Sequence, residues 1–223
     1  NIGACNVAIR SSAVSEDSLK FSFAGLHDSF LNVKASLDLV LQNIKRCWAS
    51  VFNKRAMIYR IRRGLSRLEA MAVIVQRMIP AKISGVTFTR HPFTPKNLLI
   101  EAVYGLGTTL VEGRVEPDQY VVDRESLNIV NIRVGNKGKV CIAEEEGLKI
   151  LDMANHAAKK SVLTDQQILY IAKISLAVER LFGYPQDIEW CIDNDDNLWI
   201  LQSRAITEAK SYGGDNGGEE RNN

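Results

Sequence analysis

Long apolar runs and cysteine motifs are both missing from this 223-residue chain. No apolar stretch approaches the ~18 residues that a membrane-spanning helix needs, and the N-terminus lacks the charged and apolar regions of a signal peptide. The four cysteines are scattered, and neither a disulfide framework nor a zinc pattern is visible among them. We therefore expect reduced thiols in a cytoplasmic protein that does not contact a membrane.

A bias towards one sign of charge is also missing, because 28 Lys and Arg residues face 26 Asp and Glu residues. This balance argues against a general attraction to nucleic acid or to acidic membranes. Residues 45–67 are the local exception, with eight basic residues and no acidic one. They could form a nucleic-acid face, but no aromatic stacking pattern or recognised motif accompanies them. A solvated helix face is the preferred interpretation.

What the chain does contain is 46% hydrophobic residues, enough for one sizeable domain or two small lobes. Apolar residues at three- and four-residue spacing predict a helix over residues 35–63. A second helix is predicted over Asp165–Phe182. Thr164 and Gln167 form a capping box at its start, and Gly183 follows its last residue.

Apolar runs at Ala72–Ile79, Ile83–Arg90 and Leu98–Val103 are typical of strands that are buried on both faces. Glu101 interrupts the third run, and a carboxylate there is costly to bury without a cation or hydrogen-bond donors. Three shorter strands form a predicted meander at Tyr120–Val122, Asn128–Val134 and Lys139–Ile142.

The stretch Asp187–Arg204 predicts a β-hairpin around a polar four-residue loop. In that register Glu189 lies opposite Gln202, and Asp187 lies opposite Arg204. Directly opposed residues share a face of the sheet, so one face carries two carboxylates, an amide and a guanidinium. Two interpretations remain open: an exposed polar face with an Asp–Arg pair, or a site for a metal and a polyphosphate. Carboxylates suit Mg²⁺, and arginine suits phosphate oxygens.

A strand predicted at Asn6–Arg10 runs directly into a segment rich in hydroxyl side chains, residues 11–17. Small and hydroxyl residues let the backbone approach an anion, which Arg10 at the strand end could also meet. The alternative, favoured from this segment alone, is that its Ser and Asp residues only cap turns.

Several segments occur together in a recognisable order: VAIRSSAVSED with SFAGLHDSFLNV, AVIVQRMIPAKISGVTFTRHP, IEAVYGLG with LVEGRVEPDQYVVD, and DIEW with LWILQSRAIT. Over about residues 6–208 they resemble the nucleotide-binding domain of the phosphoenolpyruvate synthase and pyruvate phosphate dikinase family, which includes the rifampicin phosphotransferases. The resemblance implies an α+β ATP-grasp fold whose two lobes hold ATP. Residues 1–70 would then form a first lobe without its N-terminal part, residues 71–208 the second lobe, and residues 209–223 a disordered tail.

The resemblance also implies which residues bind the nucleotide. Arg10 and Arg204 are the expected arginines at the phosphates. The other residues expected to contact ATP are Ser11, Ser12, Gly25, Ser29, Gln76, Arg77, Met78, Glu101, Glu112 and Gln202. The implied Mg²⁺ ligands are Glu189 and Gln202, with Asp187 beside them.

Members of the family are expected to pass the β-phosphoryl group of ATP to a histidine on a separate swivelling domain, leaving AMP and phosphate. The expected partners are therefore ATP and the phosphohistidine and acceptor domains of a parent enzyme, not nucleic acid. The chain starts abruptly, after the point where the family carries a phosphate-binding lysine, and the carrier histidine is absent. His91 stands where relatives more often have Asp or Asn, and Ser29 where Thr is common.

Several alternatives to this function remain open. One is a truncated, non-catalytic remnant that only binds nucleotide or protein. A second is an antibiotic kinase similar to rifampicin phosphotransferase, and a third is a carboxylate ligase that leaves ADP. The order of the family segments argues strongly against the ligase.

Overall fold

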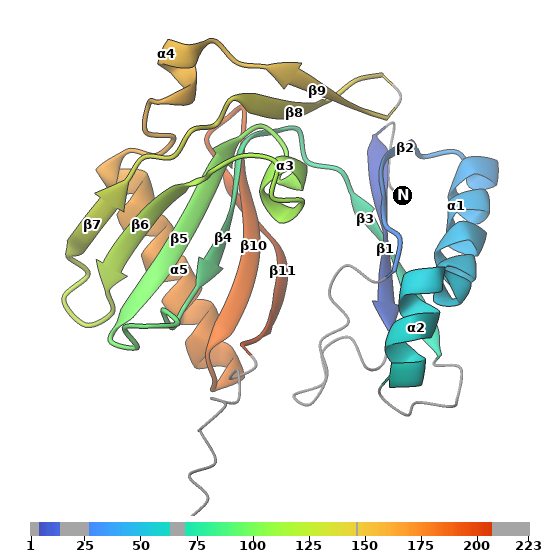
Figure 1. Cartoon of the computed structure of the whole chain (residues 1–223), viewed down its shortest axis with the longest axis horizontal. Helices are drawn as coiled ribbons and strands as arrows, with labels where there is room; N and C mark the ends of the chain where they lie inside the picture. The colour runs from blue at the N-terminus through green and yellow to red at the C-terminus, as the bar shows by residue number, and fades with distance from the viewer. Residues whose placement is uncertain (1–4, 14–26, 63–69, 146, 207–223) are drawn as a thin grey trace, which may run out of the picture.

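The computed structural model describes residues 5–13, 27–62, 70–145 and 147–206 (Figure 1). Within these residues the protein has an α+β fold that combines antiparallel sheets with a few helices, as the sequence predicts. No helix in this part of the chain is both long and apolar enough to cross a membrane. The tail at 209–223, which the sequence predicts to be disordered, lies outside the described residues.

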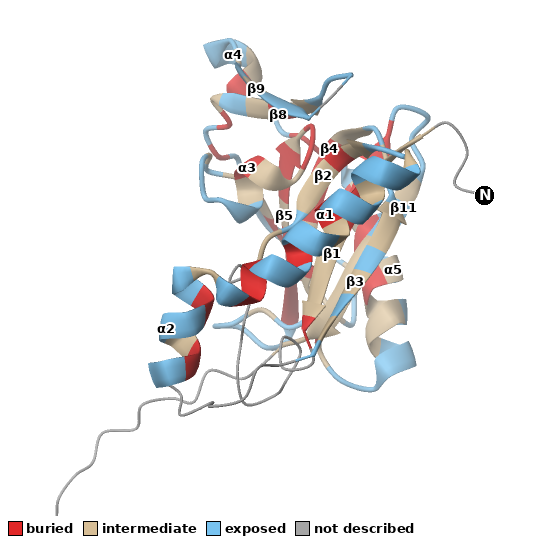
Figure 2. Ribbon diagram, turned by 90° about the vertical axis from the view of Figure 1, so that its right-hand side faces the viewer, coloured by how far each residue is buried: buried red, intermediate tan, exposed pale blue. Residues whose placement is uncertain are grey.

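A small sheet of three antiparallel strands is built from two separate parts of the chain. Its order is β2–β1–β3, and its strands are β1 (Asn6–Ala13), β2 (Phe30–Lys34) and β3 (Met71–Arg77). Helix α1 (Leu37–Ala49) packs on this sheet, where Val7, Ile9 and Cys47 form a buried centre (Figure 2). Along β3, by contrast, side chains are half-buried or exposed. β3 is an edge strand, so the prediction that it is buried on both faces is wrong.

The pairing of β3 also bears on the expected division into lobes, which assigns residues 71–77 to the second lobe. In the structure β3 runs antiparallel to β1, with Val75 opposite Ile9, and so belongs to the small sheet. A continuous apolar run does not reveal which sheet it joins, because its periodicity does not distinguish one partner strand from another.

The single helix predicted over residues 35–63 is divided in the structure. A 3-10 turn at Ser50–Phe52 follows α1, and α2 then covers Lys54–Arg62. Asn53 lies between them with an extended ψ of 142°, and its side chain donates to Asp28 Oδ2 at 3.0 Å. The helical spacing of apolar residues continues across this break and therefore does not predict it.

A large sheet of six antiparallel strands forms the other half of the molecule (Figure 1). Its order is β11–β10–β4–β5–β6–β7, and its strands are β4 (Ala81–Phe88), β5 (Asn97–Tyr104), β6 (Asp118–Asp123), β7 (Ile129–Arg133), β10 (Gln186–Asp193) and β11 (Leu198–Ala205). Helix α5 (Asp165–Phe182) covers one face and closes the main hydrophobic core. The predicted capping box of Thr164 and Gln167 is present, and Gly183 ends the helix with a φ of 80°.

A two-stranded arm made of β8 (Lys139–Ala143) and β9 (Leu148–Asp152) leaves the large sheet and extends towards the small one (Figure 1). The predicted meander therefore ends at β7, and β8 pairs with β9 instead. At the base of the arm, the fully buried ion pair of Asp118 and Lys137 joins β6 to the chain before β8. Two short helices lie on either side of the arm in sequence: α3 (Thr108–Val111) and α4 (Asn155–Ala158).

Strands β10 and β11 form the predicted hairpin, but not with one uniform register. Near the turn Ile192 lies opposite Leu198, one residue away from the register predicted for a four-residue loop. Leu201 is then an extra residue in β11, a bulge that shifts the pairing by one. The two polar pairs are consequently those predicted: Glu189 with Gln202, and Asp187 with Arg204.

Candidate functional site

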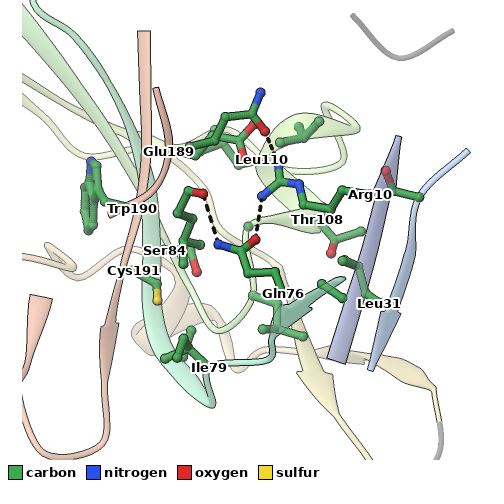
Figure 3. A pocket seen from close by; sticks show the side chains of 18 of the residues that line it. Arg10, Leu31, Gln76, Ile79, Ser84, Thr108, Leu110, Glu189, Trp190 and Cys191 are labelled. Carbon is green, nitrogen blue, oxygen red and sulfur yellow. Dashed lines mark hydrogen bonds and ion pairs between the residues drawn. The ribbon is translucent and has the colours of Figure 1, made fainter. Parts of the chain in front are cut away.

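A cavity of about 420 Å³ lies between the small and the large sheet (Figure 3). This volume falls within the roughly 300–1,000 Å³ of typical small-molecule sites. All three strands of the small sheet contribute to it, and β4, β10, β11 and the segment at 106–112 line the opposite side. The cavity is therefore built by segments from both ends of the chain and cannot form from either sheet alone.

One part of the cavity wall is apolar. The apolar side chains there include Leu31 of β2, Ile79 after β3, and Leu110 of α3 (Figure 3). Cys191 adds a thiol whose pKa burial raises to about 12, so it stays protonated and acts as an apolar wall group. This part of the cavity suits a flat, weakly polar group such as a heterocyclic base.

The polar part of the cavity is organised by Arg10 of β1 (Figure 3). Its Nη2 donates to Glu189 Oε2 at 2.6 Å and also to Gln202 Oε1, while its Nη1 reaches Gln76 Oε1 at 3.5 Å. Gln76 Nε2 in turn donates to the carbonyl oxygen of Leu201 at 3.1 Å. A bulge disrupts the hydrogen-bond ladder between two strands around its extra residue. Here the extra residue is Leu201, and its carbonyl oxygen accepts a hydrogen bond from Gln76 of the small sheet. The hairpin and the small sheet are thus joined by side chains at the cavity.

Two oxygen atoms converge at this place, since Glu189 Oε2 and Gln202 Oε1 both accept from the same nitrogen of Arg10. Oxygen donors of this kind suit Mg²⁺, which is usually bound by one or two carboxylates and completed by water and substrate phosphates. Among the described residues, no group of three or more His, Cys, Asp or Glu side chains is arranged to hold a metal. The oxygen pair therefore fits a cation that arrives with other ligands, and it does not form an all-protein cage.

Asp187 and Arg204 form the second polar pair of the hairpin, with Arg204 Nε donating to Asp187 Oδ2 at 2.8 Å. Burial raises the pKa of Asp187 above its ordinary value, although the Arg204 charge opposes this shift. Arg204 lines the cavity, whereas Asp187 does not. Asp187 therefore pairs with Arg204, the second of the two arginines predicted to bind phosphate. Glu189 and Gln202 supply the two converging oxygen atoms.

Most of the residues predicted to contact a nucleotide line this one cavity. They are Arg10, Ser11, Ser29, Gln76, Arg77, Met78, Glu112, Glu189, Gln202 and Arg204. Ser12, Glu101 and Asp187 are not part of the lining, and Gly25 lies outside the described residues. Sequence segments up to 194 positions apart, from Arg10 to Arg204, are thus brought together as the predicted site requires.

Glu101 lies on the same face of the large sheet as Glu189, with Val86 of β4 between them. Its partner is Gln119 of β6, which lies directly opposite and donates to Glu101 Oε1 at 2.7 Å. The expectation that this carboxylate needs a cation or a donor is met by the Gln119 amide. Gln119 was not predicted from the sequence to be a site residue, although it belongs to the segment EPDQYVVD.

Gly85 is another residue that the sequence analysis missed. A Cβ atom at this position would lie 2.3 Å from the carbonyl oxygen of Glu101 and 2.2 Å from Trp190 Cζ2. The buried Trp190 ring therefore packs directly against the backbone of β4, on the face opposite Glu189. A glycine inside a strand often marks such a close approach, so the run ISGVTF contained the signal.

His91 lies in the turn after β4 and does not line the cavity. Its Nδ1 accepts hydrogen bonds from the backbone N–H groups of Phe93 at 3.1 Å and Thr94 at 3.2 Å. The side-chain oxygen of Asp or Asn accepts the same kind of bond in an Asx turn. The Nδ1 of His91 therefore takes the acceptor role that a carboxylate or amide oxygen has in such a turn.

The family described as "Pyruvate phosphate dikinase, AMP/ATP-binding domain" matches residues 2–221. The chain belongs to this family. It is therefore an AMP/ATP-binding domain, and the family resemblance predicted from the sequence is confirmed.

Individual relatives are similar over nearly all of the chain. A probable phosphoenolpyruvate synthase of Archaeoglobus fulgidus is 39% identical over 204 residues, which cover 90% of this chain and 27% of the relative. The phosphoenolpyruvate synthase of Pyrococcus furiosus is 39% identical over 215 residues, 92% of this chain and 26% of the relative. A rifampicin phosphotransferase of Bacillus subtilis is 42% identical over 204 residues, 90% and 23% respectively. The chain spans about a quarter of the length of these relatives.

Proposed function

We propose that this chain binds Mg-ATP in the cavity between its two sheets and serves as the ATP site of a phosphotransferase. The convergence of Arg10, Glu189 and Gln202 on one end of an otherwise largely apolar cavity carries this proposal. The base would lie against Leu31 and Ile79, and the phosphates would lie towards the arginines. Such an arrangement is that of an ATP-grasp fold, which the two-sheet architecture supports.

In this site the protein supplies charge and position rather than a nucleophile, which is what phosphoryl transfer demands. Mg²⁺, when bound, would supply positive charge at the phosphates. Glu189 and Gln202 would hold it, and Arg10 would leave their oxygens for the phosphates. Arg204, held by Asp187 through the 2.8 Å bond from its Nε, lines the cavity and would supply a second positive charge to the same phosphates.

We further propose that the β-phosphoryl group passes to a histidine on a separate swivelling domain of a cytoplasmic parent enzyme, leaving AMP and phosphate. The relatives, which are about four times as long as the matched segment, support a role as one domain among several. One of these relatives is named phosphoenolpyruvate synthase and another rifampicin phosphotransferase. We infer that one kind of ATP-binding domain serves enzymes with different phosphoryl acceptors. Formation of ADP instead of AMP by a full-length enzyme carrying this domain would contradict this step.

Calorimetric titration of the chain with Mg-ATP tests the binding proposal, using Glu189→Gln as the decisive variant. The substitution keeps the shape but removes the carboxylate, so we expect Mg-ATP to bind about 10–100-fold more weakly, the size of a lost charge-assisted interaction of ~1.5–3 kcal/mol. Glu116→Gln is the matched control, because Glu116 pairs with Arg133 on the exposed surface. Equal affinity in the wild type and Glu189→Gln would reject the assigned site. Absence of binding in the wild type would favour the remnant interpretation.

A further inference from the structure

The arm formed by β8 and β9 meets the small sheet at a place separate from the Arg10 contacts. Asn32 of β2 makes the shortest hydrogen bonds there, since its Nδ2 donates to the carbonyl oxygens of Glu144 at 2.7 Å and Gly147 at 2.6 Å, and Asn6 of β1 adds a longer one to the carbonyl oxygen of Glu145 at 3.4 Å. The carbonyls of Glu144 and Gly147 flank the turn of the arm, whose position is 112 to 115 residues further along the chain. The nearest strand of the small sheet is thus attached to the end of the arm.

The Asn32 side chain is fully satisfied as well as buried. Asn6 of β1 donates to Asn32 Oδ1 at 2.8 Å, so the oxygen and both amide hydrogens have partners, and the residue is only 4% exposed. A buried amide with every donor and acceptor paired fixes its neighbours, because any displacement leaves polar groups unpaired. Asn32 therefore holds the small sheet and the arm together through buried hydrogen bonds, and it is not an incidental surface contact.

The backbone at Asn32 connects this contact to the cavity. Its φ of 57° is in the left-handed region, which asparagine tolerates better than most residues. It lies at the irregularity where the β1–β2 pairing shifts between Val7 and Ile9. Leu31, the residue immediately before it, lines the cavity (Figure 3). Asn32 therefore directly follows, at an irregularity of the strand, a residue that supplies part of the cavity wall.

The base of the arm is attached to a second part of the cavity wall. Leu106 N donates to the carbonyl oxygen of Cys141 in β8 at 2.8 Å, and Gly105 forms a parallel bridge with Cys141. A Cβ atom at Gly105 would lie 2.3 Å from that carbonyl oxygen, so glycine permits this close approach. Leu106 begins a segment that continues to Glu112 and contributes six of the cavity-lining residues. The arm thus contacts the small sheet at its end and the 106–112 segment at its base.

We propose that the β8–β9 arm couples the two sides of the cavity, and that Asn32 is the positioning residue that fastens the small sheet to it. Through the arm, the position of the small sheet is transmitted to the 106–112 segment. The coupling stands on the contacts alone. Its consequence for Mg-ATP affinity rests on the proposed function, and the two are measured separately.

Hydrogen–deuterium exchange of the whole chain without nucleotide tests the coupling. Asn32→Gly removes the side chain but tolerates the left-handed φ, so backbone strain does not confound the result. We expect exchange to become about tenfold faster in two places, the arm at 139–152 and the segment at 106–112, as expected for losing buried hydrogen bonds. Asn131→Gly, on the exposed strand β7, is the control and should leave both segments unchanged.

The two outcomes of this experiment separate coupling from a local contact. Faster exchange in the arm alone, with 106–112 unchanged, would overturn the proposal, and so would no change in either segment. Unchanged protection of α5 verifies that the variant is folded. If Asn32→Gly does not fold, Asn6→Ala tests the same coupling, because it removes the donor to Asn32 Oδ1 and the direct hydrogen bond from Asn6 to the Glu145 carbonyl oxygen of the arm.

Titration with Mg-ATP then measures the consequence for binding. We expect Asn32→Gly to bind the nucleotide several-fold more weakly than the wild type and the Asn131→Gly control. An unchanged affinity in Asn32→Gly would overturn the link to the nucleotide site. Failure of the wild type to bind Mg-ATP would count against the proposed function, while the exchange result would still decide whether the arm couples the two segments.

Discussion

The two sheets differ in how they are held together, although each supplies half of the site. The large sheet has a continuous core closed by α5, with Ile100, Tyr120 and Trp190 almost completely buried. The small sheet has only a small buried centre beneath α1, and Leu37 and Trp48 on that helix are 74% and 52% exposed. The large sheet is therefore stable through its own packing. The small sheet depends more strongly on contacts with its surroundings.

This difference assigns different roles to the polar residues of the site. Glu189, Gln202 and Arg204 stand on the well-packed sheet, whereas Arg10 and Gln76 stand on the weakly packed one. Sites on rigid elements hold their geometry, and the less stable parts of a protein are those that open locally. We expect the small sheet to be the part that moves when nucleotide enters or leaves.

The largest expected effect on stability concerns the buried ion pair of Asp118 and Lys137 in the large sheet. Asp118→Asn would leave the fully buried Lys137 without its counter-ion, and breaking such a pair costs about 3–5 kcal/mol. The carboxylate also accepts from Gly135 N and Val162 N, so the loss reaches three segments. Urea denaturation followed by circular dichroism measures the change in the free energy of unfolding.

A matched control for this prediction is Asp152→Asn on the arm. Asp152 pairs with Lys139, but both side chains are largely exposed, and such pairs contribute about 0–1 kcal/mol. A loss below about 1 kcal/mol in Asp118→Asn would mean that the buried pair does not anchor the large sheet.

Two isoleucines give a direct test of the difference between the sheets. Ile168 of α5 and Ile9 of β1 are both fully buried, and each substitution by alanine costs about 2–5 kcal/mol locally. We expect Ile168→Ala to lower the stability of the whole chain. Ile9→Ala should accelerate hydrogen exchange mainly in the small sheet, because α5 does not depend on that packing. Equal acceleration in both sheets would show that they unfold as one unit.

The smallest expected effect is a pH dependence at the hairpin turn. A hydrogen bond from the Trp199 indole, with further donors from Asn197 and Asp195, lowers the pKa of Asp193 to about 2. Since the folded pKa lies below the unfolded value of about 3.9, this carboxylate stabilises the protein above that value and the contribution is lost as the pH falls through about 2.

Asp193→Asn should therefore flatten the acid limb of a stability curve measured between about pH 4 and pH 2. The substitution should leave the two polar pairs of the hairpin in place, because the Leu201 bulge separates these pairs from the turn. An acid limb identical to that of the wild type would show that the turn hydrogen bonds do not contribute.

The hairpin shows both how far the sequence predicts the site and where it stops. Strand alternation correctly pairs Glu189 with Gln202, but the register at the turn is off by one. The Leu201 bulge compensates for this error. A bulge is defined by the extra residue and its hydrogen bonds, and the apolar pattern of β11 does not reveal it.

Other features could not be predicted because they depend on contacts between segments distant in sequence. The apolar run at Ala72–Ile79 does not reveal that it pairs with β1, and helical spacing does not reveal the turn at Asn53. The bonds from Asn32 to the arm cross more than a hundred residues. By contrast, the capping box of α5 is local and was predicted completely.

The tight packing of Trp190 against Gly85 has an optical consequence. Trp190 is buried in the large-sheet core and donates to Thr87 Oγ1 at 2.9 Å, whereas the half-exposed Trp48 donates to Met71 O of the small sheet at 3.1 Å. The two indoles should therefore emit at different wavelengths, the buried one further to the blue. In a Trp199→Phe variant, which lacks the third tryptophan on β11, Trp48 and Trp190 would be the two remaining intrinsic fluorophores, one reporting on each sheet. The order in which the sheets come apart could then be followed without any attached label.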